Sequence, residues 1–250
     1  MRGSSTKNKL KALILAGGRG KRLDEYTHEI NKCMMNFNGK PLIEHSLENS
    51  LKLNVAEIIV VVGYLGGQII NHYGSNFKGT PIKYVIQREQ HGIVHAMACA
   101  KETMGAADFI LMLGDEFFIE ANHQQMFDFF KKTKAFCVCG IIQVDDIKLI
   151  SKTYAIICDK DSRQILRLIE KPLNPVNHFM GTGNIIFKNR ILDYIAKTPV
   201  SLQRHERELP DLIQCAVDDR QQVCYHVLAS RYVNVNAVED TVLIKSIARE

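Results

Sequence analysis

The residues best suited to chemistry form a glycine-rich turn near the start of the chain, Leu-Ala-Gly-Gly-Arg-Gly-Lys-Arg-Leu at positions 15–23. An apolar stretch at 11–16 runs directly into this turn and predicts a strand. The glycines let the backbone fold tightly and bring N–H groups against an anion, while Arg19, Lys21 and Arg22 add positive charge. The pattern therefore predicts a phosphate-binding loop.

Two better-known phosphate-binding loops do not fit this turn. A P-loop has Ser or Thr after its lysine, whereas Lys21 is followed by Arg22. The dinucleotide fingerprint has Gly or Ala where this chain has Leu23, and no acidic residue ends a second strand at the usual distance. A glycine-rich turn with solvated basic side chains is the alternative that the sequence leaves open.

A second candidate site follows the apolar stretch at 109–113, where the chain reads Gly114-Asp115-Glu116. Ligands of parallel α/β sheets bind beyond the carboxyl ends of the strands. Mg²⁺ favours one or two carboxylates together with phosphate oxygens and water. We therefore expect Asp115 to be a metal ligand, and the capping of a turn is the alternative role for this residue.

Gln87 follows another predicted strand and suggests a contact with a nucleobase. A side-chain amide can present a donor and an acceptor to a pyrimidine edge, and Gly92, at the start of a predicted helix, allows a base to lie close to the backbone. Because the amide can flip, uracil, thymine and cytosine all remain candidates.

Strands and helices alternate in the first half of the sequence. Strands are expected there at 11–16, 57–62, 83–86 and 109–113, and helices at 41–53, 66–73 and 92–104. In the second half, strands are expected at 135–143, 153–158, 165–170, 181–187, 223–227 and 232–235, and helices at 208–218 and 238–248. The first half predicts a parallel α/β sheet, and the second half predicts mixed or antiparallel additions to it.

The composition is typical of one globular domain. The 250 residues are 46% hydrophobic and 24% charged, so we expect one domain over 10–250 after a disordered polar segment at 1–9. No stretch resembles a signal peptide or approaches the ~20 apolar residues of a membrane span, which favours a cytoplasmic protein. The net charge of +5 is mild and suits phosphorylated ligands, and no basic block interleaved with aromatic residues indicates nucleic acid.

Cysteine and histidine patterns favour neither a disulfide framework nor a zinc site. The seven cysteines are an odd number and most lie in apolar stretches, so we expect free thiols. No Cys-x-x-Cys occurs, and the helical pair His91 and His95 lacks the intervening Glu of a zinc protease.

Further motifs follow in order along nearly the whole chain from residue 11 onward. After the glycine loop come Asn31-Lys32, Gly39-Lys40-Pro41-Leu42-Ile43, Tyr84-Val85-Ile86-Gln87, Gly92-Ile93-Val94-His95-Ala96, Leu113-Gly114-Asp115, Glu170-Lys171-Pro172, Gly181-Thr182-Gly183-Asn184, the segment 204–211, and Tyr232-Val233-Asn234-Val235-Asn236. Together they resemble the sugar-1-phosphate nucleotidylyltransferases, which make nucleoside diphosphate sugars. The resemblance implies the nucleotide-diphospho-sugar transferase fold, a single α/β domain with a Rossmann-like, mixed but mainly parallel sheet and flanking helices.

The resemblance also implies a role for each candidate residue. Nucleotide binding falls to Leu15, Ala16, Gly17, Gly18, Arg19, Gly20, Gln87 and Gly92, acceptor binding to Tyr154, Ala155, Glu170, Lys171, Gly183 and Arg204, and catalysis to Arg22, Lys32, Asp115 and Lys171. Arg22 would hold the departing β- and γ-phosphates and Lys32 the α-phosphate. Lys171 and Arg204 would hold the acceptor phosphate, and a solvated surface role is their alternative. A phosphate monoester is already an anionic nucleophile, so cations rather than a general base are expected to carry the catalysis.

The implied metal ligands depart from the family pattern. Many members place a second aspartate where this chain has Asn234, and an amide oxygen is a weaker ligand for Mg²⁺ than a carboxylate. Some uridylyltransferases look similar in using asparagine there, so Asp115 and Asn234 are the implied ligands, with Asn236 as the neighbour that could substitute. Glu116 stands where the family often has asparagine, and its carboxylate could join the metal shell or face solvent.

The sequence therefore predicts a Mg²⁺-dependent transfer of a nucleotidyl group from UTP, dTTP or CTP to a sugar 1-phosphate, with release of pyrophosphate. One alternative is a CTP-dependent cytidylyltransferase acting on a phosphoalcohol or phosphonate, because Tyr154 and Glu170 suit a cationic acceptor as well as sugar hydroxyls. Another is a non-catalytic nucleotide-binding relative. The expected partners are the nucleoside triphosphate and the phosphorylated small-molecule acceptor, without nucleic acid or membrane, and family habit implies a homodimer.

Overall fold

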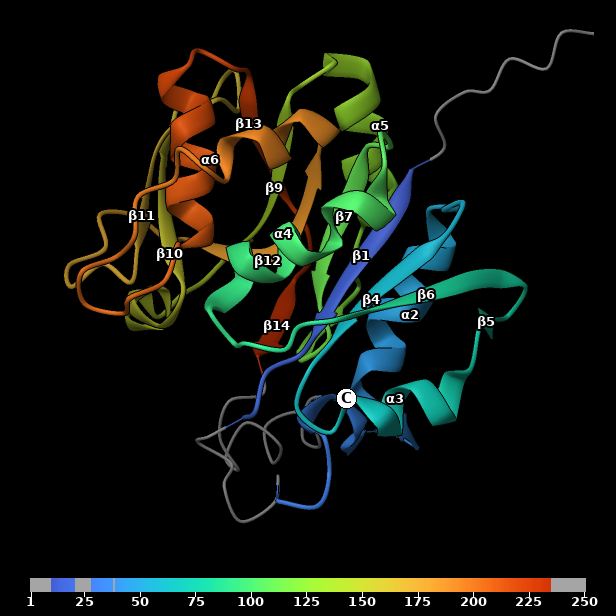
Figure 1. Ribbon diagram of the computed structural model, residues 1–250. Coiled ribbons are helices and arrows are strands. Elements are labelled where there is room, and N and C mark those ends of the chain that lie inside the picture. The colour runs from blue at the N-terminus through green and yellow to red at the C-terminus, as the bar shows by residue number, and fades with distance from the viewer. Residues whose placement is uncertain (1–9, 21–27, 38, 235–250) are drawn as a thin grey trace, which may run out of the picture.

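Ten strands form one central sheet in the part of the chain that the structure describes (Figure 1). The computed structural model describes residues 10–20, 28–37 and 39–234. The strand order is β11-β10-β12-β7-β1-β4-β6-β5, and β9 joins it through β12 and carries β13. The strands of this sheet are β1 (Lys11–Ala16), β4 (Ile58–Val62), β5 (Asn76–Phe77), β6 (Thr80–Ile86), β7 (Phe109–Leu113), β9 (Cys137–Gln143), β10 (Tyr154–Cys158), β11 (Ile165–Glu170), β12 (Phe179–Phe187) and β13 (Val223–Val227).

The centre of the sheet is parallel, as predicted. β1 pairs with β4 and with β7, and β4 pairs with β6, all in parallel. Every residue of β4 is buried, and so is every residue of β1 after Lys11. Such continuous apolar strands are typical of a sheet that is covered on both faces.

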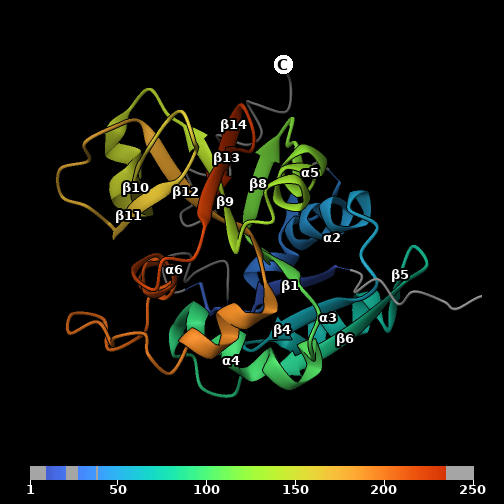
Figure 2. The ribbon, with the colours of Figure 1, turned by 90° about the horizontal axis from the view of Figure 1, so that it is seen from above.

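Helices provide that cover on both sides. The helices are α2 (Leu42–Lys52), α3 (Gly66–Tyr73), α4 (Gly92–Met104), α5 (His123–Thr133) and α6 (Leu209–Asp218). Leu13 and Ile59 lie in one hydrophobic cluster with residues of α4 and α6, whereas Ile14 and Ile58 lie in a second cluster with residues of α2, α3 and α5. Figure 2 shows α4 and α2 on opposite sides of β1. This single domain with a mixed, mainly parallel sheet confirms the predicted fold class.

The second half of the chain adds antiparallel strands, also as predicted. β12 runs antiparallel to β7, β9 and β10, and β11 runs antiparallel to β10, whereas β13 is parallel to β9. A separate two-stranded sheet pairs β8 (Glu116–Ile119) with β14 (Arg231–Asn234). In its register Asn234 lies opposite Glu116, so the pairing brings Asn234 beside the residue that follows Asp115.

Several elements lie where no strand or helix was predicted, among them β8 and α5. Helix α5 buries His123, Met126 and Phe130, whose spacings of three and four residues are typical of a helix, so the sequence did carry a signal for it. The remaining short elements are η2 (Lys32–Met34), β2 (Asn36–Phe37), β3 (Lys40–Pro41), η3 (Ile147–Lys152) and η4 (Asn189–Tyr194). The segment 1–9 and the helix expected at 238–248 lie outside the described residues, so the domain boundaries stay a prediction.

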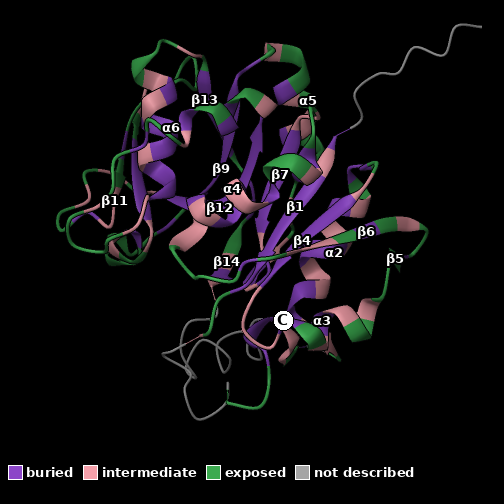
Figure 3. Cartoon of the chain, in the orientation of Figure 1, coloured by how far each residue is buried: buried purple, intermediate pink, exposed green. Residues whose placement is uncertain are grey.

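Figure 3 shows that the buried residues concentrate in the sheet strands and in the helix faces that pack on them. All seven cysteines are free thiols, and four of them are buried in this core. Within the described ranges, no helix combines the length and the apolar character needed to span a bilayer. The cytoplasmic location stays a prediction.

Candidate active site

The predicted nucleotide-binding residues gather at the carboxyl ends of the parallel strands. Gly17 and Gly18 follow β1, Gln87 follows β6, and Asp115 lies two residues after β7. A cavity at this edge is lined by Leu15, Gly17, Gly18, Gln87, Gln90, Gly92, Ile93, Ala96, Leu113, Asp115 and Glu206. The arrangement matches the rule that ligands of open α/β sheets bind beyond the carboxyl ends of the strands.

The turn after β1 packs tightly against the turn after β4. A Cβ atom at Gly63 would lie 2.5 Å from the backbone oxygen of Gly17, so a side chain at position 63 would collide with the loop. The backbone N–H of Tyr64 and the Nε2 of Gln90 donate to that same oxygen, at 3.3 and 2.9 Å. The start of the loop is therefore fixed by backbone contacts.

The other predicted loop residues lie away from this cavity or beyond the described chain. Ala16 is buried at the end of β1. The guanidinium of Arg19 lies 5.3 Å from the centroid of the Tyr64 ring, and Gly20 has a φ of 66°, in the region that favours glycine. Arg22, the predicted partner of the departing phosphates, lies outside the described residues.

The amide of Gln87 is held in one orientation. Its Nε2 donates to the backbone oxygen of Gly92 at 3.2 Å and lies 3.0 Å from Nδ1 of His95. Because a carbonyl oxygen only accepts, the amide nitrogen must face Gly92, and Nδ1 of His95 must then accept. A flipped amide would set two oxygens against each other, so the free rotation considered from the sequence does not hold in the fold. The remaining Oε1 faces Gly17, where it would lie 2.9 Å from an added Cβ atom.

Two of the predicted catalytic residues meet directly. The Nζ of Lys32 lies 2.6 Å from Oδ2 of Asp115. Lys32 is placed by η2, whose first turn is capped by Asn31: the Asn31 side chain accepts from the N–H of Cys33 and donates to the backbone oxygen of Tyr64. The ammonium therefore stands at the end of β7, beside the cavity that would hold the nucleotide.

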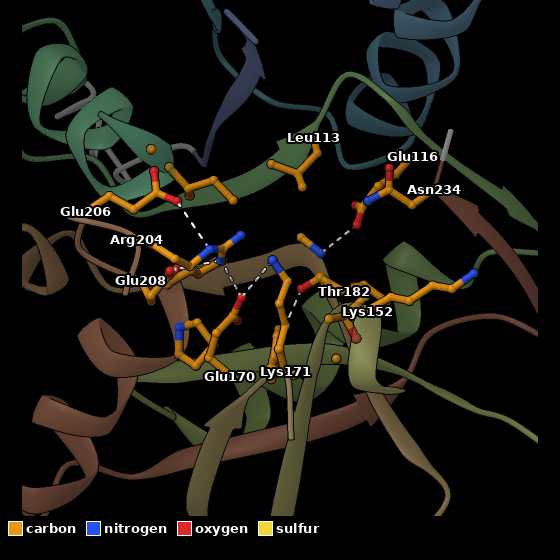
Figure 4. A pocket seen from close by; sticks show the side chains of 18 of the residues that line it. Leu113, Glu116, Lys152, Glu170, Lys171, Thr182, Arg204, Glu206, Glu208 and Asn234 are labelled. Carbon is orange, nitrogen blue, oxygen red and sulfur yellow. Dashed lines mark hydrogen bonds and ion pairs between the residues drawn. The ribbon is translucent and has the colours of Figure 1, made fainter. Parts of the chain in front are cut away.

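A second cavity of about 270 Å³ adjoins the first and contains most of the predicted acceptor-binding residues (Figure 4). Its lining includes Tyr154, Glu170, Lys171, Gly183 and Arg204. Four residues, Gly92, Ile93, Leu113 and Glu206, line both cavities. A ligand in one cavity would therefore lie next to a ligand in the other.

Ala155 departs from the prediction. Successive side chains of a strand point to opposite faces, and Tyr154 lines the cavity, so Ala155 points away from it. Its side chain is buried in a separate apolar cluster with Ile142 and Met180. The hydroxyl of Tyr154 is also committed, because it donates to the backbone oxygen of Thr182 at 3.1 Å.

Arg204 is surrounded by carboxylates. Its Nη1 lies 2.9 Å from Oε1 of Glu170 and 2.8 Å from Oε1 of Glu208, and its Nε lies 3.8 Å from Oε1 of Glu206. Lys171 also points toward Glu170, with 3.5 Å between Nζ and Oε1 (Figure 4). Burial raises the pKa of Glu170 and of Glu208, and the nearby Glu170 raises that of Glu208 further. The two cations are therefore paired with carboxylates in the wall of the cavity, and a phosphate bound there could take the place of a carboxylate.

Of the predicted metal ligands, the structure describes Asp115 and Asn234, and Glu116 lies next to both of them. Oδ1 of Asn234 is buried and has no hydrogen-bond partner among the described residues. Glu116 does not face solvent, contrary to one of the alternatives above, because only 2% of it is exposed. Burial raises the pKa of Glu116 to about 7. Asn236 lies outside the described residues.

Several residues of the cavities were not singled out from the sequence. Lys152, at the end of η3, and the two glutamates beside Arg204, Glu206 and Glu208, line the acceptor cavity. The segment around Arg204 reads Arg-His-Glu-Arg-Glu, and such a charge run is more often a solvated surface, so the spacing alone carried no signal.

Comparison with known proteins gives consistent matches. Over residues 11–232 the sequence matches the family model described as nucleotidyl transferase. The UTP–glucose-1-phosphate uridylyltransferase AglF of Haloferax volcanii is 33% identical over 178 residues, which cover 71% of this chain and 72% of that protein. A glucose-1-phosphate thymidylyltransferase of Streptomyces griseus is 26% identical over 242 residues, which cover 96% of this chain and 66% of that protein.

A comparison with solved structures also finds sugar nucleotidyl transferases. A UDP-glucose pyrophosphorylase structure, solved as a complex with UDP-glucose, superposes with a TM-score of 0.86 at 19% identity. The match covers 96% of this chain and 98% of that one. At this identity the match shows a shared fold.

Proposed function

Because the chain belongs to the nucleotidyl transferase family, we propose that it transfers a nucleotidyl group from UTP, dTTP or CTP to a sugar 1-phosphate, giving an NDP-sugar and pyrophosphate. The observation that carries the proposal is the pair of adjoining cavities at the carboxyl edge of the sheet, one with the glycine loop and one with Lys171 and Arg204. Such a pair can hold a nucleotide and a phosphorylated acceptor side by side.

The chemistry proposed for this site needs cations and alignment. A phosphate oxygen of the acceptor attacks the α-phosphorus of the nucleotide in line; the new P–O bond forms as the bond to the β-phosphate oxygen breaks, and pyrophosphate leaves. Lys171 and Arg204 hold the acceptor phosphate, and Lys32 stabilises the charge that develops on the α-phosphate. No group has to remove a proton, because the acceptor phosphate is already an anion near neutral pH.

The described residues fit a magnesium ion. Asp115 supplies a carboxylate, and Oδ1 of Asn234 is a buried acceptor that lacks a donor among the described residues. Mg²⁺ prefers such oxygen ligands and completes its shell with phosphate oxygens and water. When bound, it would neutralise charge on the nucleotide phosphates.

One observation favours a second candidate, a cytidylyltransferase for a phosphoalcohol or phosphonate. Glu170, Glu206 and Glu208 all lie within 4 Å of Arg204 atoms, so three carboxylates cluster on one side of the acceptor cavity. An acceptor with a positively charged amine could pair with one of these carboxylates. Sugar hydroxyls would use the same carboxylates as hydrogen-bond acceptors.

Pyrophosphate release tests the proposal. We expect release with Mg²⁺, one of UTP, dTTP and CTP, and either glucose 1-phosphate or N-acetylglucosamine 1-phosphate. Release only with CTP and phosphocholine or 2-aminoethylphosphonate would favour the second candidate.

Asp115→Asn should lower kcat by roughly a hundredfold or more, because it removes negative charge from the metal site and from the pair with Lys32.

The same β7 strand offers a matched control for that variant. Asp108 precedes β7 and lies 2.8 Å from Nζ of Lys188, so it forms the same kind of pair at the opposite end of the strand. Asp108→Asn should keep wild-type kcat. Equal losses in the two variants would show that the site is not at the carboxyl edge of the sheet.

A further inference from the structure

The Glu116 carboxylate joins three strands in the wall of the second cavity, which it lines together with Gly183, Tyr232 and Asn234. Its Oε1 accepts the backbone N–H of Gly183 and the hydroxyl of Tyr232, both at 2.8 Å. Its Oε2 accepts Nδ2 of Asn184 at 2.7 Å. One side chain of β8 therefore holds residues of β12, on the acceptor side, and of β14, on the metal side.

Gly183 depends on this carboxylate because β12 is irregular here. The strand pairs with β9 at 179–181 and again at 185–187, and its register shifts between the two. The N–H of Gly183 donates to Glu116, and a Cβ atom at Gly183 would lie 2.3 Å from Cγ of Leu113 and 3.0 Å from Oε2 of Glu116. Gly183 thus packs closely between Leu113 and Glu116, and these two side chains determine the position of its backbone.

The same carboxylate fixes β14. Tyr232 donates its hydroxyl to Glu116, and Asn234, two residues later, points to the same face of the strand. Asn234 is also the register partner of Glu116, and its Oδ1 is the buried oxygen to which none of the described residues donates. The place of that oxygen is therefore set by the pairing of β14 with β8, which the Tyr232 hydrogen bond reinforces.

We propose that Glu116 is a positioning residue that fixes Gly183 on the acceptor side and, through Tyr232, Asn234 on the metal side. The kinetic consequence rests on the function proposed above, and the structural consequence rests on the hydrogen bonds alone. Both oxygens of Glu116 already accept protein donors and only 2% of the residue is exposed, so the main role of the carboxylate is to orient other residues, although it also lines the acceptor cavity. Acceptor affinity and the magnesium requirement should then depend on one buried side chain.

Kinetics of Glu116→Ala, compared with Glu57→Ala, test this role in the full chain. Glu57 pairs with Lys11 at 3.0 Å and with Lys83 at 2.7 Å, so it is a carboxylate that joins strands at the opposite end of the sheet. In Glu116→Ala, the acceptor KM and the Mg²⁺ concentration for half-maximal rate should each rise by roughly tenfold, because a hydrogen bond to a charged group is lost on each side. The nucleotide KM should change by less than about twofold. Glu57→Ala should lower Tm and leave all three quantities unchanged.

Two further variants separate the two sides. Tyr232→Phe removes only the hydrogen bond on the metal side, so it should raise the Mg²⁺ requirement and spare the acceptor KM. Glu116→Gln keeps an oxygen for Gly183 and Tyr232 and should recover most of the acceptor affinity once Asn184 turns its amide and His123 takes the tautomer that accepts at Nε2. Equal losses of acceptor and nucleotide affinity in Glu116→Ala would overturn the proposal.

Hydrogen exchange provides a readout without catalysis. The amide of Gly183 should exchange faster in Glu116→Ala than in the wild type or in Glu57→Ala. Unchanged exchange at Gly183 would overturn the positioning role, even in an active enzyme. Faster exchange in a chain that transfers no nucleotidyl group to any acceptor would support the positioning role and contradict the proposed function instead.

Discussion

Lys32 and Asp115 lie 2.6 Å apart, and only 8% of the lysine side chain is exposed. A buried ammonium needs such a partner, because an unpaired charge in that place would be strongly destabilising. Arg204 also pairs with two carboxylates, those of Glu170 and Glu208, but its side chain is 34% exposed. At the scale of single residues, the protein thus holds these cations in place with carboxylates.

His95 should contribute to nucleotide binding without touching the nucleotide. It accepts from Nε2 of Gln87, which among the described residues otherwise donates only to Gly92, so His95→Leu leaves the Gln87 amide less restrained. We expect the nucleotide KM to rise by roughly threefold to tenfold, the effect of one lost hydrogen bond, and kcat to change less. His91→Leu, at a side chain that is 62% exposed, should have no effect in the same assay. An unchanged nucleotide KM in His95→Leu would mean that the orientation of Gln87 does not matter for binding.

At the scale of elements, the site depends on how closely the turns after β1 and β4 approach each other. Gly63→Ala would place its Cβ 2.5 Å from the oxygen of Gly17, and it should lower the free energy of unfolding by roughly 1–3 kcal/mol and reduce activity. Gly67 lies in α3 with nothing within 4 Å of an added Cβ, so Gly67→Ala should instead raise stability by about 0.5–1 kcal/mol. Urea unfolding of both variants checks this pair, and a stable Gly63→Ala would contradict the tight loop contact.

The elements also show what the sequence could predict. The location of Gly17, Gln87 and Asp115 at one edge of the sheet could be predicted from the sequence. Local apolar patterns mark the strands that these residues follow, and parallel strands bring their carboxyl ends to one edge. The hydrogen bond from the backbone N–H of Gly183 to the Glu116 carboxylate joins residues that are 67 positions apart, so no local sequence pattern predicts it.

The same reason explains where the lining of the second cavity differs from the prediction. Ala155 was placed in the pocket by a motif that does not show which face of β10 each residue takes. The carboxylates beside Arg204 depend on how the segment before α6 folds back onto the pocket.

At the scale of the whole molecule, stability should fall in mild acid because of a buried imidazole. His123 is 1% exposed and donates from Nε2 to Asn184, and burial lowers its pKa from 6.5 to about 4. Because the folded pKa lies below the unfolded one, the neutral form stabilises the fold. This contribution to the free energy of unfolding is complete above about pH 6.5 and is lost as the pH falls through about 4. The difference between the two pKa values corresponds to roughly 3 kcal/mol.

Urea unfolding at pH 7 and pH 4.5 measures this contribution. Glu116, whose pKa burial raises to about 7, acts in the opposite direction, so the comparison is made between the wild type and His123→Gln. The stability advantage of the wild type over His123→Gln should shrink between pH 7 and pH 4.5. An advantage that is the same at both pH values would contradict a neutral, buried His123.

The central claim is that an acceptor phosphate attacks the α-phosphorus at this site. The most direct measurement is mass spectrometry of the products formed from a pyrimidine nucleoside triphosphate, Mg²⁺ and glucose 1-phosphate whose phosphate carries ¹⁸O. The account predicts that all of the label appears in the NDP-sugar and none in pyrophosphate, and that Asp115→Asn forms little of either. Label in pyrophosphate, or full product formation by Asp115→Asn, would contradict it.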